Sequence, residues 1–255
     1  AGVSYGTKSA SLVAAKLLTW QPDFPLHALC LDAILLDRIA ELKNWTGVFG
    51  RFLGTNATQV LRTAGVDEME TRAEKLRDAG DDQAAANVIE EMWRTTVKLT
   101  GVKNQHDLSP DYRYLSDVFA YDVQSKAFIA NLNAKLALDL PTFQGCNGAV
   151  WSGFAGSRLR DATWSLSEVL EKGVRVLLFS GFWDGMCTVE GTTAWLEESF
   201  PGKCHFLNVN DSNISQDTTE ILAWQSVVHV EVASCGHGVA DCQPGIYSAV
   251  LKAFL

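Results

Sequence analysis

The chain opens with a Gly-x-Ser-x-Gly turn, which constrains the fold more than any other stretch. In Gly2-Val3-Ser4-Tyr5-Gly6 the two glycines flank a serine at the spacing of a nucleophile elbow. Such an elbow turns sharply from a strand into a helix, so that a strained serine projects its hydroxyl into a pocket. Residues 9–18 follow with side chains at helical spacing, as an elbow requires. Three fixed residues also recur by chance in ordinary loops, so the interpretation depends on an acid and a histidine further along.

The acid and the histidine follow in the required order. Residues 174–181 have the pattern of a buried strand, and Asp184 stands just beyond its end. Residues 227–233 have the pattern of a second strand, and Gly236-His237-Gly238 follows it. Serine, aspartate, then histidine is the order of the α/β-hydrolase catalytic triad. Taken singly, Asp184 would be a turn residue and His237 a loop histidine; taken jointly and in this order, they predict a triad.

Three segments resemble the serine carboxypeptidase family of α/β hydrolases. The elbow is similar to that family's Gly-Glu-Ser-Tyr-(Gly/Ala)-Gly, and residues 181–187, GFWDGMC, resemble its acid segment, in which the aspartate precedes a cysteine by three. Residues 235–244, CGHGVADCQP, resemble its Gly-His-Met-Val-Pro-x-x-x-Pro histidine loop. The resemblance implies a serine hydrolase that cleaves peptide or ester bonds through an acyl-enzyme on Ser4.

Two positions depart from the family's motifs. Val3 stands where the family has a glutamate, or an aspartate in its acyltransferase branch, and in peptidases that residue helps to hold the substrate's terminal carboxylate. Valine accepts no hydrogen bond. Gly238 stands where the family has a methionine that lines the leaving-group side of the site. The expected lining of the substrate pocket is Val3, Trp183, Cys187 and Gly238. Peptidase, esterase and acyltransferase activities therefore all stay open.

The resemblance also predicts the layout of the chain. We expect an α/β-hydrolase fold that lacks its N-terminal strands and carries a helical cap between core strands. Residues 1–37 would begin the core with the elbow, a helix and a strand, although the apolar run 26–36 by itself suits a strand or a helix. Residues 38–145 would form the cap, for which a solvated surface layer is the plainer alternative, and residues 146–255 would complete the core.

Periodicity predicts further elements in these regions. Helices are expected in the cap at residues 67–79, 84–99 and 121–138, and in the core at residues 189–200 and 245–255. A short strand is expected at residues 205–209, with residues 212–216 as the polar turn to the next strand. His106 has no constellation of functional residues around it in the sequence.

An elbow needs a strand in front of it, and only three residues precede Ser4; the family's earlier strands and its glycine-rich oxyanion loop have no counterpart here. The remaining oxyanion donor would be the backbone amide of Tyr5, and loss of one such donor typically costs ~10²–10³ in turnover. We expect the downstream part of a longer protein, with a second chain as one possible source of the missing half. The alternative is a non-catalytic fragment or pseudoenzyme that serves as an interaction subunit.

Composition excludes several other classes of function. The chain has 255 residues, enough for one large core, and a net charge of −9 with scattered positive residues. A surface for nucleic acid or anionic membranes needs a basic patch instead. No apolar run approaches the ~20 residues that a membrane-spanning helix needs. We expect no nucleic-acid partner and no membrane span.

Sequons and cysteines indicate an oxidising compartment. Asn-x-Ser/Thr occurs four times, at Asn44, Asn56, Asn210 and Asn213, which predicts a glycoprotein that is secreted or vacuolar/lysosomal. Six cysteines allow up to three disulfides, at positions 30, 146, 187, 204, 235 and 242. By resemblance Cys187 is expected to be reduced. The cysteines show no C-x₂-C metal spacing, and we expect neither a metal nor a cofactor.

Overall fold

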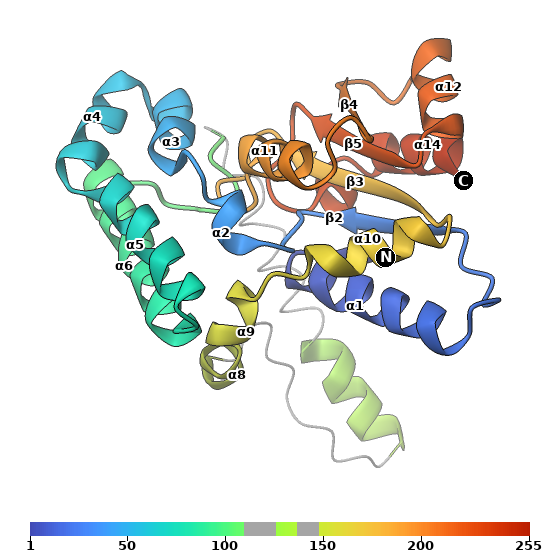
Figure 1. Cartoon of the computed structure of the whole chain (residues 1–255), viewed down its shortest axis with the longest axis horizontal. Helices are drawn as coiled ribbons and strands as arrows, with labels where there is room; N and C mark the ends of the chain where they lie inside the picture. The colour runs from blue at the N-terminus through green and yellow to red at the C-terminus, as the bar shows by residue number, and fades with distance from the viewer. Residues whose placement is uncertain (110–125, 137–147) are drawn as a thin grey trace.

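The computed structural model describes residues 1–109, 126–136 and 148–255, and its centre is a parallel sheet (Figure 1). The five strands lie in the order β1-β2-β3-β5-β4, and every neighbouring pair is parallel. The strands are β1 (Gly2–Val3), β2 (Ala28–Asp32), β3 (Arg175–Gly181), β4 (Cys204–Val209) and β5 (Val227–Val232). Because the strands are parallel, all of their carboxyl ends meet at one edge of the sheet.

Helices cover both faces of the sheet, which is why its central strands are mostly apolar. Alternate residues point to opposite faces, so Val176 and Leu178 of β3 join one core cluster while Leu177 and Phe179 join the other. The first face is covered by α1 (Tyr5–Trp20), α10 (Thr163–Glu171) and α11 (Val189–Ser199). The second face is covered by α12 (Gln216–Trp224), α13 (Val239–Cys242) and α14 (Pro244–Phe254).

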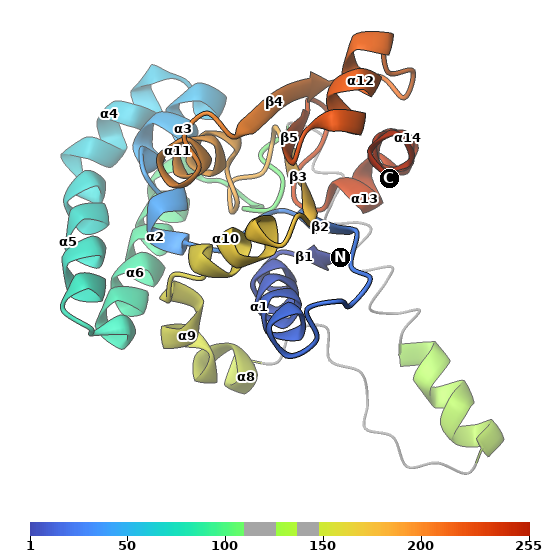
Figure 2. The same cartoon turned by 45° about the vertical axis from the view of Figure 1, so that its right-hand side comes forward.

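A helical region lies in the chain between β2 and β3, and α3–α6 stand to one side of the sheet in both views (Figures 1 and 2). Its helices are α2 (Arg38–Glu41), α3 (Trp45–Leu53), α4 (Thr55–Thr63), α5 (Val66–Asp78), α6 (Asp82–Thr100), helix 126–136, α8 (Gly148–Gly153) and α9 (Ala155–Leu159). This region has a core of its own around Trp45, Phe49 and Met92, separate from the two clusters on the sheet. None of the described helices combines the length and the apolar character that crossing a membrane requires.

The predicted strands are confirmed, and the ambiguous run 26–36 contains β2. The helices predicted at 67–79 and 84–99 are α5 and α6, whereas the one predicted at 121–138 lies partly outside the described residues. One prediction is wrong: residues 212–216 do not simply turn the chain from β4 to β5. The two strands are parallel, so the connection must cross back over the sheet, and α12 makes that crossover.

A fully buried carboxyl group lies where α2 meets α11. Glu41 has no solvent exposure, and its Oε1 accepts hydrogen bonds from the amides of Leu36 (2.8 Å) and Asp37 (3.2 Å). Its Oε2 is buried without a hydrogen-bond partner among the described residues. Burial raises the pKa of Glu41 to about 8, although the nearby positive charge of Arg38 favours ionisation.

We expect Glu41 to make the protein less stable in alkali. Its pKa is higher in the folded chain than in the unfolded chain, so the folded state binds more protons and stability falls as the pH rises from about 4.5 to about 8. Glu41→Gln keeps the acceptor and removes the titration. Urea unfolding at pH 5, 6.5 and 8 should show a smaller loss of stability for this variant than for wild type. Glu68→Gln, on the exposed surface of α5, is the matched control; equal slopes for Glu41→Gln and wild type would contradict the assignment.

Candidate active site

Ser4 lies at the junction of β1 and α1 in a strained backbone conformation. Its φ of 54° and ψ of −129° are unusual for a residue with a side chain, and strain of this kind persists only where the surroundings enforce it. The Ser4 amide donates to the carbonyl of Asp32 (2.9 Å), and the Thr7 amide and hydroxyl both donate to the Ser4 carbonyl. A Cβ on Gly2 would lie 2.4 Å from the Gly6 carbonyl oxygen, so the turn requires glycine there. The backbone thus has the shape that the Gly-x-Ser-x-Gly pattern predicts.

Asp184 lies in the loop after β3 and is almost completely buried. Its Oδ1 accepts from the amides of Met186 (2.7 Å) and Cys187 (2.9 Å), which fix the carboxylate in place. Its Oδ2 accepts from Nδ1 of His237 at 2.8 Å. The fold therefore brings Asp184 and His237 into direct contact, although they are far apart in the sequence.

His237 lies in the loop after β5, and its hydrogen bond to Asp184 assigns the proton to Nδ1. The ring nitrogen that carries the lone pair is then Nε2, as a general base requires. Burial of the ring opposes protonation, but the charge of Asp184 and its hydrogen bond prevail and raise the pKa of His237 above its ordinary value. Ser4 lies at the same carboxyl-end edge of the sheet, where β2 separates β1 from β3.

Two other predicted site residues, Tyr5 and Val3, adjoin Ser4 in the chain. Tyr5 begins α1, so its amide belongs to the first turn, whose N–H groups have no partner within the helix. Its side-chain hydroxyl lies 3.2 Å from the hydroxyl of Ser157. Val3 is 47% exposed on β1, so its side chain is accessible to a ligand. The predicted oxyanion donor and one predicted pocket residue thus flank Ser4.

The other predicted pocket residues differ in accessibility. Cys187 is buried beside Ala33 and Leu35 behind the Asp184 loop, and burial holds its pKa well above the ordinary value. Trp183 is half-buried, with its ring 4.9 Å from that of Phe52. Gly238 has a φ of 86°, a left-handed conformation that favours glycine at the start of α13.

A segment that the sequence did not single out contacts the loops of both Asp184 and His237. We call residues 102–109 the strap. The carbonyl of Gln105 accepts from the Gly185 amide (3.0 Å), and the Leu108 amide donates to the carbonyl of Trp183 (2.8 Å). The carbonyl of His106 accepts from the His237 amide (2.6 Å). The strap therefore links the loop of Asp184 to the loop of His237.

The prediction that His106 has no constellation of residues around it is wrong. Its ring meets that of His237 edge to face, with 4.9 Å between the ring centroids. Burial and the neighbouring His237 lower the pKa of His106 to about 4, so its ring is neutral at neutral pH. Sequence periodicity has no signal for a contact of this kind, because the strap is irregular and lies about 130 residues before His237 in the chain.

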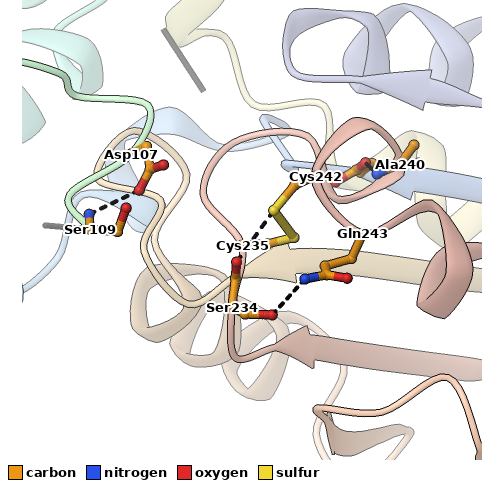
Figure 3. Close-up of a disulfide and its surroundings, with 8 residues drawn as sticks. Asp107, Ser109, Ser234, Cys235, Ala240, Cys242 and Gln243 are labelled. Atoms are coloured by element: carbon orange, nitrogen blue, oxygen red, sulfur yellow. Dashed lines mark hydrogen bonds between the residues drawn. A yellow bond between two sulfur atoms is a disulfide. The ribbon is translucent and has the colours of Figure 1, made fainter. Parts of the chain in front are cut away.

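A disulfide closes the turn that carries His237. Cys235 and Cys242 are paired, and the side-chain amide of Gln243 donates to the hydroxyl of Ser234 (3.0 Å) at the base of the turn (Figure 3). Cys187 is unpaired, as predicted, and so are Cys30 and Cys204, whereas Cys146 lies outside the described residues. The pairing itself was not readable from the sequence.

One group in the site has the atom types of a metal centre. Asp184, Cys187 and His237 bring one potential ligand atom each within 4.8 Å of one another. However, Nδ1 of His237 already donates to Asp184, and the raised pKa of Cys187 keeps the thiol protonated, whereas a metal needs the thiolate. The arrangement suits an acid–histidine pair better than a metal ligand set.

The four sequon asparagines are all exposed, at Asn44, Asn56, Asn210 and Asn213. Asn44 precedes α3 and Asn56 lies in α4, both in the helical region. Asn210 and Asn213 lie in the loop between β4 and α12. Accessibility is what attachment of a glycan requires at these positions.

The fold is that of an α/β hydrolase. A solved structure, Kex1(delta)p, a prohormone-processing carboxypeptidase from Saccharomyces cerevisiae, matches 98% of this chain with a TM-score of 0.68 at 12% sequence identity. The model of the serine carboxypeptidase family matches residues 52–255, a part that includes Asp184 and His237. The chain therefore belongs to the serine carboxypeptidase family, as its motifs predicted.

Curated relatives agree with this assignment. Serine carboxypeptidase 3 from Oryza sativa subsp. japonica is 24% identical over 178 residues, and the protein of the same name from Triticum aestivum is 22% identical over the same length. These alignments cover 67% of this chain but only 35% of the relatives. The match to the solved structure covers 60% of that chain.

We expect the disulfide to stabilise the fold measurably. The two cysteines are separated by seven positions in sequence. Closing so short a loop in the unfolded chain should raise the free energy of unfolding by about 2 kcal/mol. Urea unfolding of the double variant Cys235→Ala/Cys242→Ser should show a loss of that order, and dithiothreitol should destabilise wild type but not the variant. Cys204→Ser removes a thiol that forms no disulfide and is the control. A wild type indifferent to the reductant would contradict the pairing.

Proposed function

We propose that this chain carries the catalytic triad of a serine carboxypeptidase-like hydrolase that cleaves peptide or ester bonds. The observation that carries the proposal is the 2.8 Å hydrogen bond between His237 and buried Asp184, at the same sheet edge as Ser4 in its elbow. Membership of the serine carboxypeptidase family supports the same chemistry.

The reaction proceeds through an acyl-enzyme. Oγ of Ser4 attacks the substrate's carbonyl carbon while Nε2 of His237 takes the hydroxyl proton, which gives a tetrahedral oxyanion. The carbonyl reforms as the bond to the leaving group breaks, and the His237 imidazolium returns the proton to that group. Water then repeats the sequence on the Ser4 ester and releases the acid. Asp184 holds the imidazole in the Nδ1–H tautomer and stabilises the imidazolium.

The oxyanion needs donors aimed at it. The amide of Tyr5, at the first position of α1, is one donor, and the positive end of that helix adds to its effect. We propose that a second chain supplies the other donor. Such a chain would also cover the strand β1, which pairs with β2 alone among the described strands.

We propose that residues 38–145 form a cap over this site, with residues 1–37 and 146–255 as the core. The strap supports this division, because it runs from the end of α6 directly to the loops of Asp184 and His237. Val3, Trp183 and Gly238 would line the pocket beneath the cap, with Cys187 behind it. Val3 offers no hydrogen-bond acceptor to a substrate's terminal carboxylate. Ester cleavage and acyl transfer are therefore the alternatives to peptide cleavage within the family.

We propose a secreted or vacuolar location for the protein. A disulfide beside the site persists only in an oxidising compartment, and the four sequon asparagines are exposed to receive glycans. We expect protein from a secretory host to carry these glycans. Treatment with an endoglycosidase should lower its mass by one glycan for each modified asparagine.

The triad is tested by a fluorophosphonate probe and intact-mass analysis. Wild type should gain a single adduct on Ser4, whereas Ser4→Ala should gain none and His237→Ala should react at least ~10³-fold more slowly, because serine is a poor nucleophile without its base. His27→Ala, at an exposed histidine before β2, is the matched control and should react like wild type. Equal labelling of the His237→Ala variant would remove the histidine from the mechanism.

The same experiment separates the active enzyme from a non-catalytic subunit. An adduct that forms only when a co-purifying polypeptide is present would indicate a site shared between two chains. No adduct under either condition would favour an interaction subunit without activity. For an active protein, comparing a peptide that has a free terminal carboxylate with its amide would decide whether Val3 has abolished carboxypeptidase specificity.

A further inference from the structure

Asp32 is a buried acid beside the proposed triad that the triad itself does not use. It is the last residue of β2, the strand that lies between β1, which leads to Ser4, and β3, which leads to Asp184. Its register neighbours are Val3 on one side and Phe179 on the other. Only 1% of its surface is exposed, a rare condition for an aspartate.

Asp32 contacts both the serine turn and the histidine turn. Its main-chain carbonyl accepts from the Ser4 amide at 2.9 Å. Its Oδ2 accepts from the Ala240 amide at 3.1 Å, three residues after His237. Asp32 therefore connects the turn of Ser4 with the turn of His237. The distance between these turns determines whether the Ser4 hydroxyl can reach the His237 imidazole.

The contacts alone do not explain why this residue is acidic. A neutral asparagine has the same side-chain carbonyl and would accept from the Ala240 amide equally well. The second oxygen, Oδ1, is buried without a hydrogen-bond partner among the described residues, which makes burial of the charge still less favourable. The charge itself must therefore have a use that offsets this cost.

The groups that interact electrostatically with Asp32 indicate what that use is. They are Asp184 and Cys187 in the loop after β3, Cys30 on its own strand and Tyr247 on α14. His237, from the loop after β5, is the one base among these interacting groups. A carboxylate at Asp32 therefore favours the imidazolium form of His237.

We propose that Asp32 is a positioning residue for His237: it holds the histidine turn against the serine elbow, and its carboxylate stabilises the imidazolium formed during the reaction. The inference rests on the proposed function for its catalytic meaning. The contacts and the charge of Asp32 can be tested without any reaction.

Burial makes this contribution depend on pH. It raises the pKa of Asp32 to about 6, against the opposing effect of the Ala240 and Val239 amides and of His237. Asp32 and His237 then titrate over overlapping ranges, so each changes the apparent pKa of the other. As the pH rises, ionisation of Asp32 keeps His237 protonated up to a higher pH than Asp184 alone would.

The test is an NMR titration of the His237 ring in the full chain, for wild type, Asp32→Asn and the control Asp241→Asn. Asp241 lies in the same turn and is exposed, so its replacement removes the same charge without the buried contacts. Asp32→Asn should lower the pKa of His237 by about half a unit or more and change a broad titration into a single step. Asp241→Asn should leave the curve as in wild type. An unchanged curve in Asp32→Asn would overturn the electrostatic role.

The positioning role has its own readout. Asp32→Ala removes the acceptor for Ala240, whereas Asp32→Asn keeps it, so hydrogen exchange of the Ala240 amide should accelerate at least about tenfold in the alanine variant only. In an active protein, fluorophosphonate labelling should slow in the same order. Equal exchange in the two variants would overturn the positioning role. Loss of labelling in wild type would refute the proposed function and leave both measurements on Asp32 unaffected.

Discussion

Burial of both faces of the parallel sheet is the constraint on which the rest of this molecule depends. Because helices cover β2, β3 and β5 on each side, these strands are mostly apolar, and the buried polar side chains of His229 and Ser180 pair with each other. Chemistry in such a fold is confined to the edge where the carboxyl ends meet. The loops after β1, β3 and β5 accordingly carry Ser4, Asp184 and His237.

The same burial gives neighbouring ionisable groups different properties. His106, His229 and His237 are all largely removed from water, and burial lowers the pKa of the first two to about 4. His229 bonds only the neutral hydroxyl of Ser180 among its described partners, at 2.9 Å, so nothing offsets the loss of hydration. In His237 the Asp184 carboxylate reverses the effect of burial. The Asp184 carboxylate thus gives His237 a pKa shift opposite to that of the other two histidines.

The features that could be predicted from the sequence are those that depend on residues close together in the chain. Strands β3 and β5 were readable because apolar runs are local signals, and Asp184 and His237 were predicted as site residues because they follow those runs directly. The crossover helix α12 was missed because its mixed QDTTEILAW pattern is weak beside the strands. The Cys235–Cys242 pairing and the role of Asp32 depend on contacts between distant or irregular segments, for which periodicity carries no information.

The strap has a further consequence for how this chain can vary. Its carbonyls and amides bond both functional loops, and a Cβ on Gly236 would lie 2.4 Å from the His106 carbonyl oxygen, so the strap can neither lengthen nor shift without moving His237. The exposed connection between α5 and α6 around Gly80 has no such restriction. Evolution is therefore free to lengthen or shorten the outer helices, while residues 102–109 keep a fixed length. The helices α3–α6 can diverge in shape while the strap that follows α6 keeps its place beside His237.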